Sequence, residues 1–526
     1  MTAVHDFIIV GAGTAGCVLA ERLTASGMHR VLLIEAGTKP DSPFVRIPLG
    51  MGKLFKTHLD WNFESEPHGA LGGRRVFIPR GKMLGGSSNM NAQVHQWCHP
   101  ADFDGWSASG APGWAWNDVA TVFRRMESWV GDTGDDSLRG RNGPMVISPL
   151  RVPNPLSVAF VRAAYAVGLD GSSDYNGGPY AGAWLSQVAQ QNGRRFSTYD
   201  AYLKPALSRG NLEVRTASHA LRVLFENGRA IGVTVRRDGH EETLLAARGV
   251  ILAAGAYGTP QLLQLSGIGP AEHLREHGIP VLRDVPGIGG NLQEHPLLPV
   301  KFGARRPITL KRAESPLHLL AWLLFRRGML ASNLAEAMVF TSTTGETAPD
   351  LELCFTPVEW RQQGLEPPQV HAFGCGVVLL TPRSRGTVRL RSGDPLAAPV
   401  IDLALLSDPD GADADVLAHG LELFRRIVAT EPLASESSGE IAPGPDVHGR
   451  DAVLAYCGEA LQTIYHPAGT CRMGTDNVAP VTPELRLRTC DNLWVADASV
   501  MPTVPRGHPN AVVAMIAQRA AELIAA

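Results

Sequence analysis

Histidine is the residue type that best suits the removal of a proton from a substrate near neutral pH, although we expect most of the 17 histidines to be structural or at the surface; the candidate for this chemistry is His466. It lies in a loop-like segment, residues 465–474, with the sequence YHPAGTCRMG. A neutral imidazole has a pKa near neutrality, so it can accept a hydroxyl proton while a hydride leaves the carbon of an alcohol. Cys471 follows five residues later and offers a Cys–His nucleophilic pair as alternative chemistry. Pro467 and Gly469 do not obviously bring the two together, so we expect Cys471 to be a buried structural thiol.

A glycine-rich turn near the N-terminus predicts a dinucleotide site. Residues 11–16 read GAGTAG and separate the apolar run at 7–10 from a helical pattern that extends through 20–23. The glycines permit a tight turn and close approach of the backbone to a pyrophosphate, whose charge the helix N-terminus stabilises. Glu35 ends a second apolar run at 31–34, where a carboxylate accepts hydrogen bonds from ribose hydroxyls. NAD and FAD both bind to this motif, and this part of the chain does not separate them.

Further glycine-rich and polar segments complete the set of motifs. Residues 79–92 read PRGKMLGGSSNMNA, residues 255–269 read GAYGTPQLLQLSGIG, and DAS at 497–499 and GHPN at 507–510 follow the His466 segment. Adjacent glycines followed by serines present backbone N–H groups to a phosphate or a flat ring, although a plain Gly-Ser loop has the same composition. The segment at 255–269, taken alone, fits ordinary helix capping.

Together, in this order and over nearly the whole chain, these motifs resemble the glucose–methanol–choline (GMC) oxidoreductase family, which includes alcohol oxidases and choline and aliphatic alcohol dehydrogenases. The resemblance implies FAD, rather than a nicotinamide, as the cofactor. By motif position, it assigns to cofactor binding Gly11, Gly13, Thr14, Ala15, Gly16, Glu35, Ala36, Met83, Gly86, Ser87, Asn91, Ala92, Val94, Ala220, Asp497, Ala498 and Asn510. Some family members attach the flavin through a histidine at the position of Met90, so we expect FAD to be bound non-covalently here.

The resemblance also implies a catalytic pair. His466 takes the position of the family's base, and Asn510 takes that of a partner that holds or orients the developing alkoxide. Capping of the final helix is the alternative role for Asn510. The GHPN sequence departs from the GNTN run that is common in the family. We therefore expect His508 and Pro509 to reshape the pocket floor, with His508 packing or contacting substrate rather than sharing the base role.

Composition indicates a large globular protein that acts on a small, roughly neutral ligand. The chain has 526 residues, 44% of them hydrophobic, and its formal net charge of −3 gives no long-range field that attracts nucleic acid or an anionic membrane. A strand-like run begins at Phe7, which leaves no room for a secretory signal. Residues 319–325 (LLAWLLF) are too few to cross a bilayer, and we interpret them as a core or pocket-wall helix. The seven cysteines are scattered without a C-x-x-C pair, which argues against metal or disulfides and favours a cytoplasmic protein.

The pattern of strands and helices predicts an α/β protein, in which a Rossmann-like FAD-binding domain is interleaved with an α+β substrate domain built on an antiparallel sheet. The opening strand, helix and strand form a βαβ unit with a parallel sheet. Strands alternate with amphipathic helices between residues 300 and 455. We predict an FAD-binding domain formed by residues 1–150, 205–300 and 456–526, and a substrate-binding domain formed by residues 151–204 and 301–455.

We therefore expect an FAD-dependent oxidase or dehydrogenase that converts a small primary alcohol to an aldehyde by His466-assisted hydride transfer to flavin N5. The electrons then pass to O₂ or to another acceptor, which no motif specifies. Hydroxynitrile lyases resemble the same family, so a lyase that carries FAD without net redox turnover is the second hypothesis. A dinucleotide fold without catalysis is the third. Trp61, Trp97 and Trp360 are candidates for a pocket that favours an aryl or apolar alcohol, although tryptophan is as often a core residue.

Overall fold

A βαβ unit opens the fold in the computed structural model, which describes residues 5–132, 138–171 and 174–525. Strand β1 (His5–Val10) leads through the glycine turn into helix α1 (Thr14–Thr24), and strand β2 (Val31–Ile34) returns parallel to β1. All four residues of β2 are buried, as a parallel strand covered on both faces requires.

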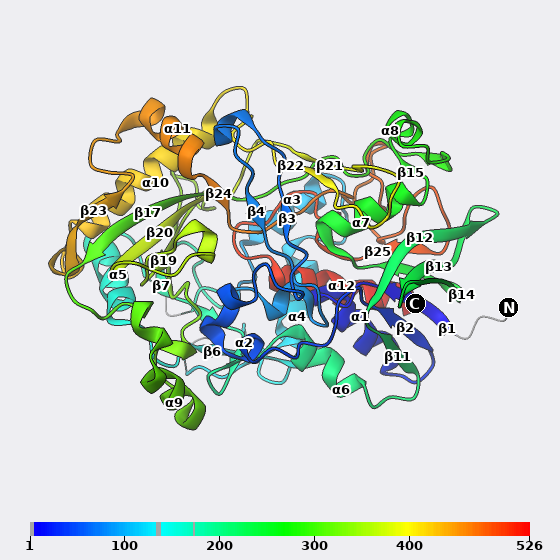
Figure 1. Ribbon diagram of the computed structural model, residues 1–526, viewed down its shortest axis with the longest axis horizontal. Coiled ribbons are helices and arrows are strands. Elements are labelled where there is room, and N and C mark those ends of the chain that lie inside the picture. The colour runs from blue at the N-terminus through cyan, green and yellow to red at the C-terminus, as the bar shows by residue number, and fades with distance from the viewer. Residues whose placement is uncertain (1–4, 133–137, 172–173, 526) are drawn as a thin grey trace.

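The first sheet is mostly parallel and extends the opening unit. Its parallel strands are β11 (Leu212–Arg215), β2, β1, β14 (His240–Leu252) and β25 (Leu493–Val495), and β12 (Ser218–Glu226) and β13 (Arg229–Arg237) add an antiparallel meander to the first half of β14. Helix α12 (Asn510–Ala525) packs against α1. Figure 1 shows this sheet on the right, with the chain's final helix, α12, beside its first, α1. The predicted Rossmann-like part is confirmed.

A second, antiparallel sheet stands apart from the first on the left of Figure 1. Its order is β23 (Ser437–Ala442), β17 (Pro296–Ala304), β20 (Ala372–Leu379), β19 (Leu351–Thr356), β18 (Ala337–Thr341) and β7 (Gly182–Leu185), with β24 (Gln462–Thr463) also on β17. The helices α5 (Pro155–Ala166), α10 (Ala412–Val428) and α11 (Gly449–Ala460) share one apolar core with this sheet. The predicted α+β part is confirmed as well. The predicted domain boundaries remain a proposal. Strand β17 starts within residues 205–300 and β24 lies within residues 456–526, which we assigned to the FAD-binding domain, yet both strands belong to the second sheet.

The remaining strands form small sheets outside the two large ones, and further helices accompany them. The other strands are β3 (Phe63–Glu64), β4 (Phe77–Ile78), β5 (Glu127–Trp129), β6 (Met145–Pro149), β8 (Gln187–Val188), β9 (Gln190–Gln191), β10 (Arg194–Arg195), β15 (Ile268–Gly269), β16 (Arg283–Asp284), β21 (Thr387–Arg389) and β22 (Val400–Asp402). The other helices are α2 (Pro43–Arg46), α3 (Pro100–Ala108), α4 (Trp116–Met126), α6 (Lys204–Ala206), α7 (Gly255–Leu265), α8 (Ala271–Glu276) and α9 (Pro316–Phe325). Short turns of helix are η1 (Pro48–Lys53), η2 (Gly69–Leu71), η3 (Gly86–Asn89), η4 (Tyr199–Leu203), η5 (Leu310–Glu314), η6 (Met329–Ala331), η7 (Gln362–Gly364), η8 (Ala434–Glu436) and η9 (Ala498–Val500).

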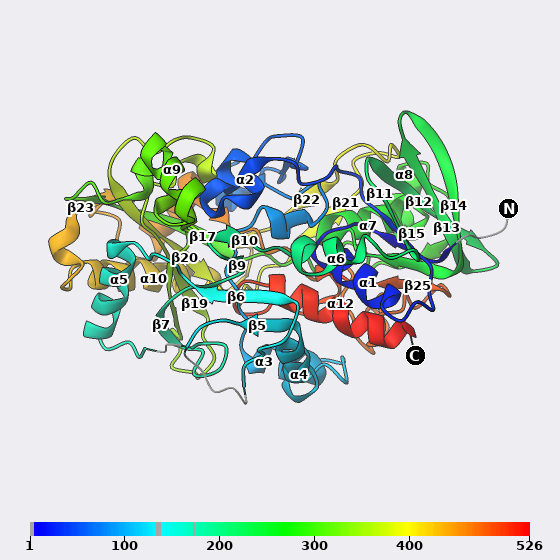
Figure 2. The ribbon, with the colours of Figure 1, turned by 90° about the horizontal axis from the view of Figure 1, so that it is seen from below.

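Helix α9 corrects one prediction from the sequence. We interpreted its apolar run as a core or pocket-wall helix, but Trp322 is the helix's one buried residue and Leu324 is 64% exposed. Figure 2 shows α9 at the outer edge of the molecule, beside α2. The apolar composition of α9 therefore does not indicate burial, and the exposure of this helix needs another explanation. None of the described helices has both the length and the apolar character needed to cross a membrane.

Candidate active site

Most of the predicted cofactor residues line a cavity of about 530 Å³ at the carboxyl ends of β1 and β2. The wall includes Gly11, Gly13, Thr14, Ala15, Glu35, Ala36, Gly86, Ser87, Ala220, Asp497 and Ala498. Segments from the start, middle and end of the chain thus meet around one space, as the motif order predicts. Gly16 and Met83 lie outside this wall: a Cβ on Gly16 would stand 1.9 Å from the carbonyl oxygen of Gly11, and Met83 is buried in an apolar cluster.

Two glycine loops form a cradle that fits the backbone-bound pyrophosphate of a dinucleotide. Gly11 has φ +100°, and a Cβ there would lie 2.5 Å from the carbonyl oxygen of Ala253. Gly86 has φ +50°, and its Cβ would lie 2.7 Å from Cα of Gly13, so the second loop is pressed against the first. A Cβ on Gly13 itself would meet nothing within 4 Å, because that position faces open space. Larger residues would therefore push the loops apart or fill the space that a phosphate needs.

Two buried carboxylates hold the turns of this cavity. Glu35 accepts the backbone N–H groups of Ala12 and Gly37, both at 2.9 Å, and burial raises its pKa to about 7. Asp497 accepts from the N–H of Gly255 at 2.9 Å and, at 2.6 Å, from the Thr259 hydroxyl, and burial raises its pKa as well. Both acids fix backbone next to the cofactor's expected position, in addition to any contact with the cofactor itself.

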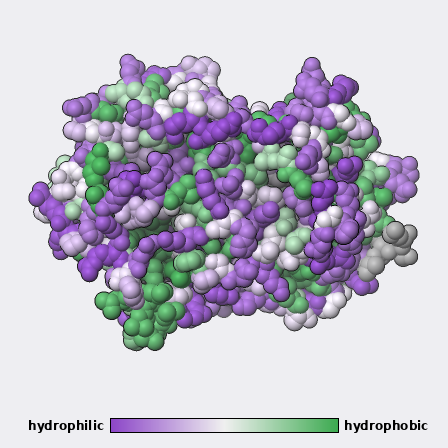
Figure 3. Space-filling model, in the orientation of Figure 1, coloured by the Kyte–Doolittle hydropathy of each residue, from purple (hydrophilic) through white to green (hydrophobic). Residues whose placement is uncertain are grey.

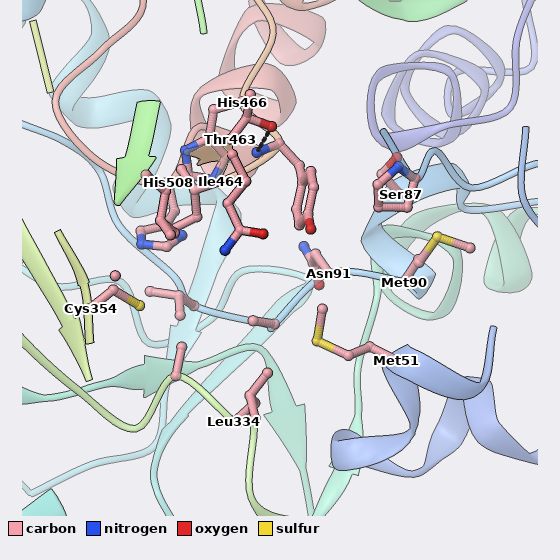
Figure 4. Close-up of a pocket in the computed structure, with 18 of the residues that line it drawn as sticks. Met51, Ser87, Met90, Asn91, Leu334, Cys354, Thr463, Ile464, His466 and His508 are labelled. Atoms are coloured by element: carbon pink, nitrogen blue, oxygen red, sulfur yellow. Dashed lines mark hydrogen bonds between the residues drawn. The ribbon is translucent and has the colours of Figure 1, made fainter. Parts of the chain in front are cut away.

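A second cavity of about 250 Å³ adjoins the first and contains the predicted catalytic pair. His466 and Asn510 line it, as do Ser87, Asn91, Ala92 and Val94 from the second glycine segment. Thr14, Ser87 and Ala498 line both cavities, so a ligand in one touches the wall of the other. Figure 4 shows His466 and His508 on one side of this space, and the apolar side chains Met51 and Leu334 on the other.

The three tryptophans that we considered for the pocket occupy different places. Trp360 lines the smaller cavity, whereas Trp61 lines the cofactor cavity and stacks on Phe63 with ring centroids 5.7 Å apart. Trp97 is a core residue that stacks on Phe123 at 5.6 Å. Of these three tryptophans, Trp360 therefore reaches the small cavity, whose wall also includes the aromatic residues Phe55 and Tyr465 together with aliphatic and sulfur-containing side chains.

A chain of two histidines determines which nitrogen of His466 is free. His295 Nε2 lies 3.1 Å from the carbonyl oxygen of Leu380, an atom that can only accept, so this nitrogen carries the proton. His295 Nδ1 is then an acceptor, and it lies 3.0 Å from His466 Nδ1, which must donate. The Nε2 of His466 consequently keeps its lone pair, as a general base requires.

Burial favours the neutral form of His466. Burial, together with His508 and His295, lowers the pKa of His466 well below its usual value. The pKa of His295 falls to about 3, mainly through burial. Glu294 accepts the backbone N–H of His466 and, at 3.1 Å, that of His295, and burial raises its own pKa to about 7.

His508 is held by a carboxylate from the second sheet. Its Nε2 lies 2.9 Å from Oε1 of Glu352 in β19, and its backbone N–H donates to Gln96 at 2.9 Å. Its ring meets that of His466 edge to face, with centroids 4.7 Å apart. Glu352 thus occupies Nε2 and fixes the His508 ring against that of His466, and the packing or substrate-contact role that we expected for His508 stays a prediction.

Asn510 joins the starts of two helices. It is the first residue of α12, and its side-chain oxygen accepts from the Thr14 hydroxyl of α1 at 2.8 Å. The amide Nδ2 thus remains as the donor for a substrate oxygen. Cys471, the alternative nucleophile, packs in the core, and burial raises the pKa of its thiol, which opposes a reactive thiolate.

Sequence reasoning missed Glu294, His295 and Glu352. Two signals could have found them. Gln293, Glu294 and His295 form a polar run directly before the apolar strand β17, and Glu352 is a lone acid within the apolar strand LELCFT. Buried polar groups in such places need partners, which makes them candidates for site residues.

A dinucleotide cavity that shares a wall with a small, histidine-lined cavity defines a dinucleotide-dependent oxidoreductase. Two sequence profiles described as GMC oxidoreductase match residues 5–297 and 382–517. The chain is 41% identical over 530 residues to an uncharacterized GMC-type oxidoreductase of Mycobacterium tuberculosis, with 100% of both chains covered. It is 38% identical over 530 residues to an alcohol dehydrogenase [acceptor] of Pseudomonas putida, covering 99% of this chain and 95% of that one.

The fold is similar to that of solved oxidases. Pyridoxine 4-oxidase from Mesorbium loti superposes with a TM-score of 0.89 at 30% identity, and 98% of each chain is covered. The chain belongs to the GMC oxidoreductase family. It is an FAD-dependent oxidoreductase that acts on CH–OH groups, as its motifs predict.

Proposed function

We propose that this enzyme oxidises a small primary alcohol to the aldehyde, with His466 as the general base and Asn510 as its partner. The observation that carries the proposal is the unprotonated Nε2 of His466 in a cavity that shares a wall with the cofactor site. Two relatives support the substrate class by their names, since one is an alcohol dehydrogenase and the other oxidises pyridoxine, an alcohol.

FAD, when bound, supplies the acceptor for the hydride that leaves the alcohol carbon. His466 Nε2 takes the hydroxyl proton, and Asn510 Nδ2 donates a hydrogen bond to the same oxygen as negative charge develops on it. His295 holds the His466 ring by accepting from its Nδ1–H. The aldehyde then leaves the cavity, and the proton on His466 returns to solvent before the next turnover.

The cavity favours a small, largely apolar alcohol. Its volume is about 250 Å³, and its apolar lining includes Met51, Leu334, Cys354 and Trp360. Wide apolar walls with a few convergent polar groups are typical of small-molecule sites. The cofactor residues assigned by the motifs, including Gly16 and Met83, stay part of the proposal. Because Met90 replaces the histidine that carries the flavin in some relatives, we also propose that FAD is non-covalent.

An anaerobic titration of the purified enzyme with aryl, aliphatic and amino alcohols tests the proposal. We expect one alcohol class to bleach the flavin band in the wild type and in His58→Ala, a control whose side chain is 68% exposed. The same alcohol should bleach His466→Ala about 10²- to 10⁴-fold more slowly, because that is the usual rate loss when a general base is removed. Re-oxidation by air distinguishes O₂ from another acceptor.

A yellow protein that no alcohol bleaches would contradict the oxidation and favour the lyase hypothesis. Bleaching at the same rate in His466→Ala would refute the role of this histidine. Release of all FAD on acid denaturation, with none left on the chain, would support non-covalent binding.

A further inference from the structure

Helix α9 displays a large apolar surface to solvent. The exposed fractions are 76% for Leu317, 42% for Leu319, 52% for Leu320, 50% for Leu323, 64% for Leu324 and 65% for Phe325. In Figure 3 they form the green patch at the lower left, where Figure 1 places α9. Contiguous apolar patches of this kind mark interaction sites rather than ordinary surface.

The helix is fixed in place along one side only. The Trp322 indole N–H donates to the carbonyl oxygen of Gly193 at 2.9 Å, and its ring packs with Ile47 and Ala331. At 3.6 residues per turn, the exposed leucines and Phe325 project in most directions away from this contact. The apolar surface is therefore convex, so a fluid partner can surround it, whereas a flat protein surface would cover one part of it.

Positive charge collects at both ends of the helix. Lys311 and Arg312 precede α9, and Arg326 and Arg327 follow it, while the helix itself contains no acid. Arg326 lies over the Trp322 ring, with its guanidinium 4.3 Å from the ring centroid. The nearby carboxylate of Glu314 pairs with Lys53 at 2.7 Å, which leaves the basic groups in excess.

We propose that α9 inserts into the surface of a membrane that contains anionic phospholipid. Acyl chains would surround the leucines and Phe325, while the flanking basic residues would meet lipid phosphates. A helix of this length is about 15 Å long, so it lies in the interface and does not span the bilayer. The overall charge of −3 gave no hint of this surface, because a net charge says nothing about local clusters.

The same surface lies next to a wall of the small cavity. Trp322 packs with Ile47, which directly precedes η1, and η1 contributes Met51 to the cavity wall. The turn η6, which follows α9, packs against η1, and Leu334 just beyond it also lines the cavity. A docked membrane would thus lie beside the apolar side of the site, where it could deliver an apolar alcohol or electron acceptor.

Flotation of the FAD-loaded enzyme with phosphatidylcholine vesicles, with and without phosphatidylglycerol, tests the proposal. We expect the wild type to float with the phosphatidylglycerol vesicles, and Leu320→Gln/Leu324→Gln to bind at least about tenfold more weakly. Arg326→Gln/Arg327→Gln should lose the preference for phosphatidylglycerol. Met28→Gln is the matched control, since Met28 is 72% exposed outside α9 and should not change binding.

Failure of the wild type to bind either vesicle, or equal binding by the leucine variant, would overturn the proposal. A lipid-free dimer that the leucine variant converts to a monomer, measured by sedimentation velocity, would assign α9 to a second copy and would also overturn it. Flavin absorbance and thermal unfolding of each variant establish that the fold is intact. Neither result depends on the alcohol proposed above.

Discussion

Replacement of His295 by leucine should slow flavin reduction, although the variant retains the His466 side chain. Its Nδ1 accepts from His466 Nδ1–H at 3.0 Å, and this contact fixes the His466 tautomer. In His295→Leu, His466 either keeps an unpaired buried N–H or moves its proton to Nε2, where the base is lost. Leaving a buried donor unpaired costs about 1–3 kcal/mol, which corresponds to a rate loss of about five- to 160-fold.

His295→Asn is the matched control for this prediction. Its amide oxygen is attached to Cγ, as Nδ1 of histidine is, so it can accept from His466 Nδ1–H. Both variants lose the bond to the carbonyl oxygen of Leu380. The difference between them therefore isolates the contact with His466.

The assay is the rate of anaerobic flavin reduction at saturating alcohol, measured by stopped flow. We expect His295→Asn to recover most of the rate that His295→Leu loses, with FAD content equal in the two. Equal rates in the two variants, whether fast or slow, would refute the tautomer argument. A loss of FAD in the leucine variant alone would instead indicate a structural role.

Three further predictions concern pH and the cofactor cradle. The rate of flavin reduction should stay constant as the pH falls through the usual histidine range and decline only at lower pH. The reason is that the pKa of His466 is lowered and the base is active only above its pKa. A rate profile with its midpoint at or above about pH 6.5 would contradict this prediction. Burial raises the pKa of Glu294 to about 7 in the folded protein. The protonated acid therefore stabilises the fold, and the free energy of unfolding should fall by about 3 kcal/mol as the pH rises from the usual glutamate pKa to about 7. Glu294→Gln keeps the Oε1 acceptor, so the variant's melting temperature should exceed that of the wild type at about pH 8 and match it at about pH 5. A variant that melts below the wild type at about pH 8 would show that ionisation of Glu294 does not destabilise the fold. Gly86→Ala should lower the melting temperature of the FAD-free protein, because the new Cβ collides with Gly13. Gly13→Ala should leave that temperature unchanged but weaken FAD binding about tenfold or more, as measured by isothermal titration. The opposite pattern would contradict the proposed cradle.

Local patterns were sufficient to predict the dinucleotide turn of the candidate cofactor site. The strand–glycine–helix pattern and Glu35 lie within one short stretch of chain, so neighbouring residues determine the turn, and β2 has the predicted bounds. His466 and Asn510 were found because their motif resembles that of a known family, and the structure places both in one cavity. By contrast, the burial of the apolar run in α9 was predicted wrongly, because the residue types in a helix do not show which other segments pack against it.

The sequence by itself determined the opening βαβ unit, the dinucleotide turn and the residue types that can transfer a proton. Only the tertiary structure decided which nitrogen of His466 is free, because His295 and Leu380 come to it from distant segments across the second sheet. The tertiary structure likewise decided that Glu352 pairs with His508 and that α9 faces solvent. The physical reason is the range of the interactions: helix and turn preferences act between near neighbours, whereas hydrogen bonds and burial depend on segments that meet only after the two sheets have formed.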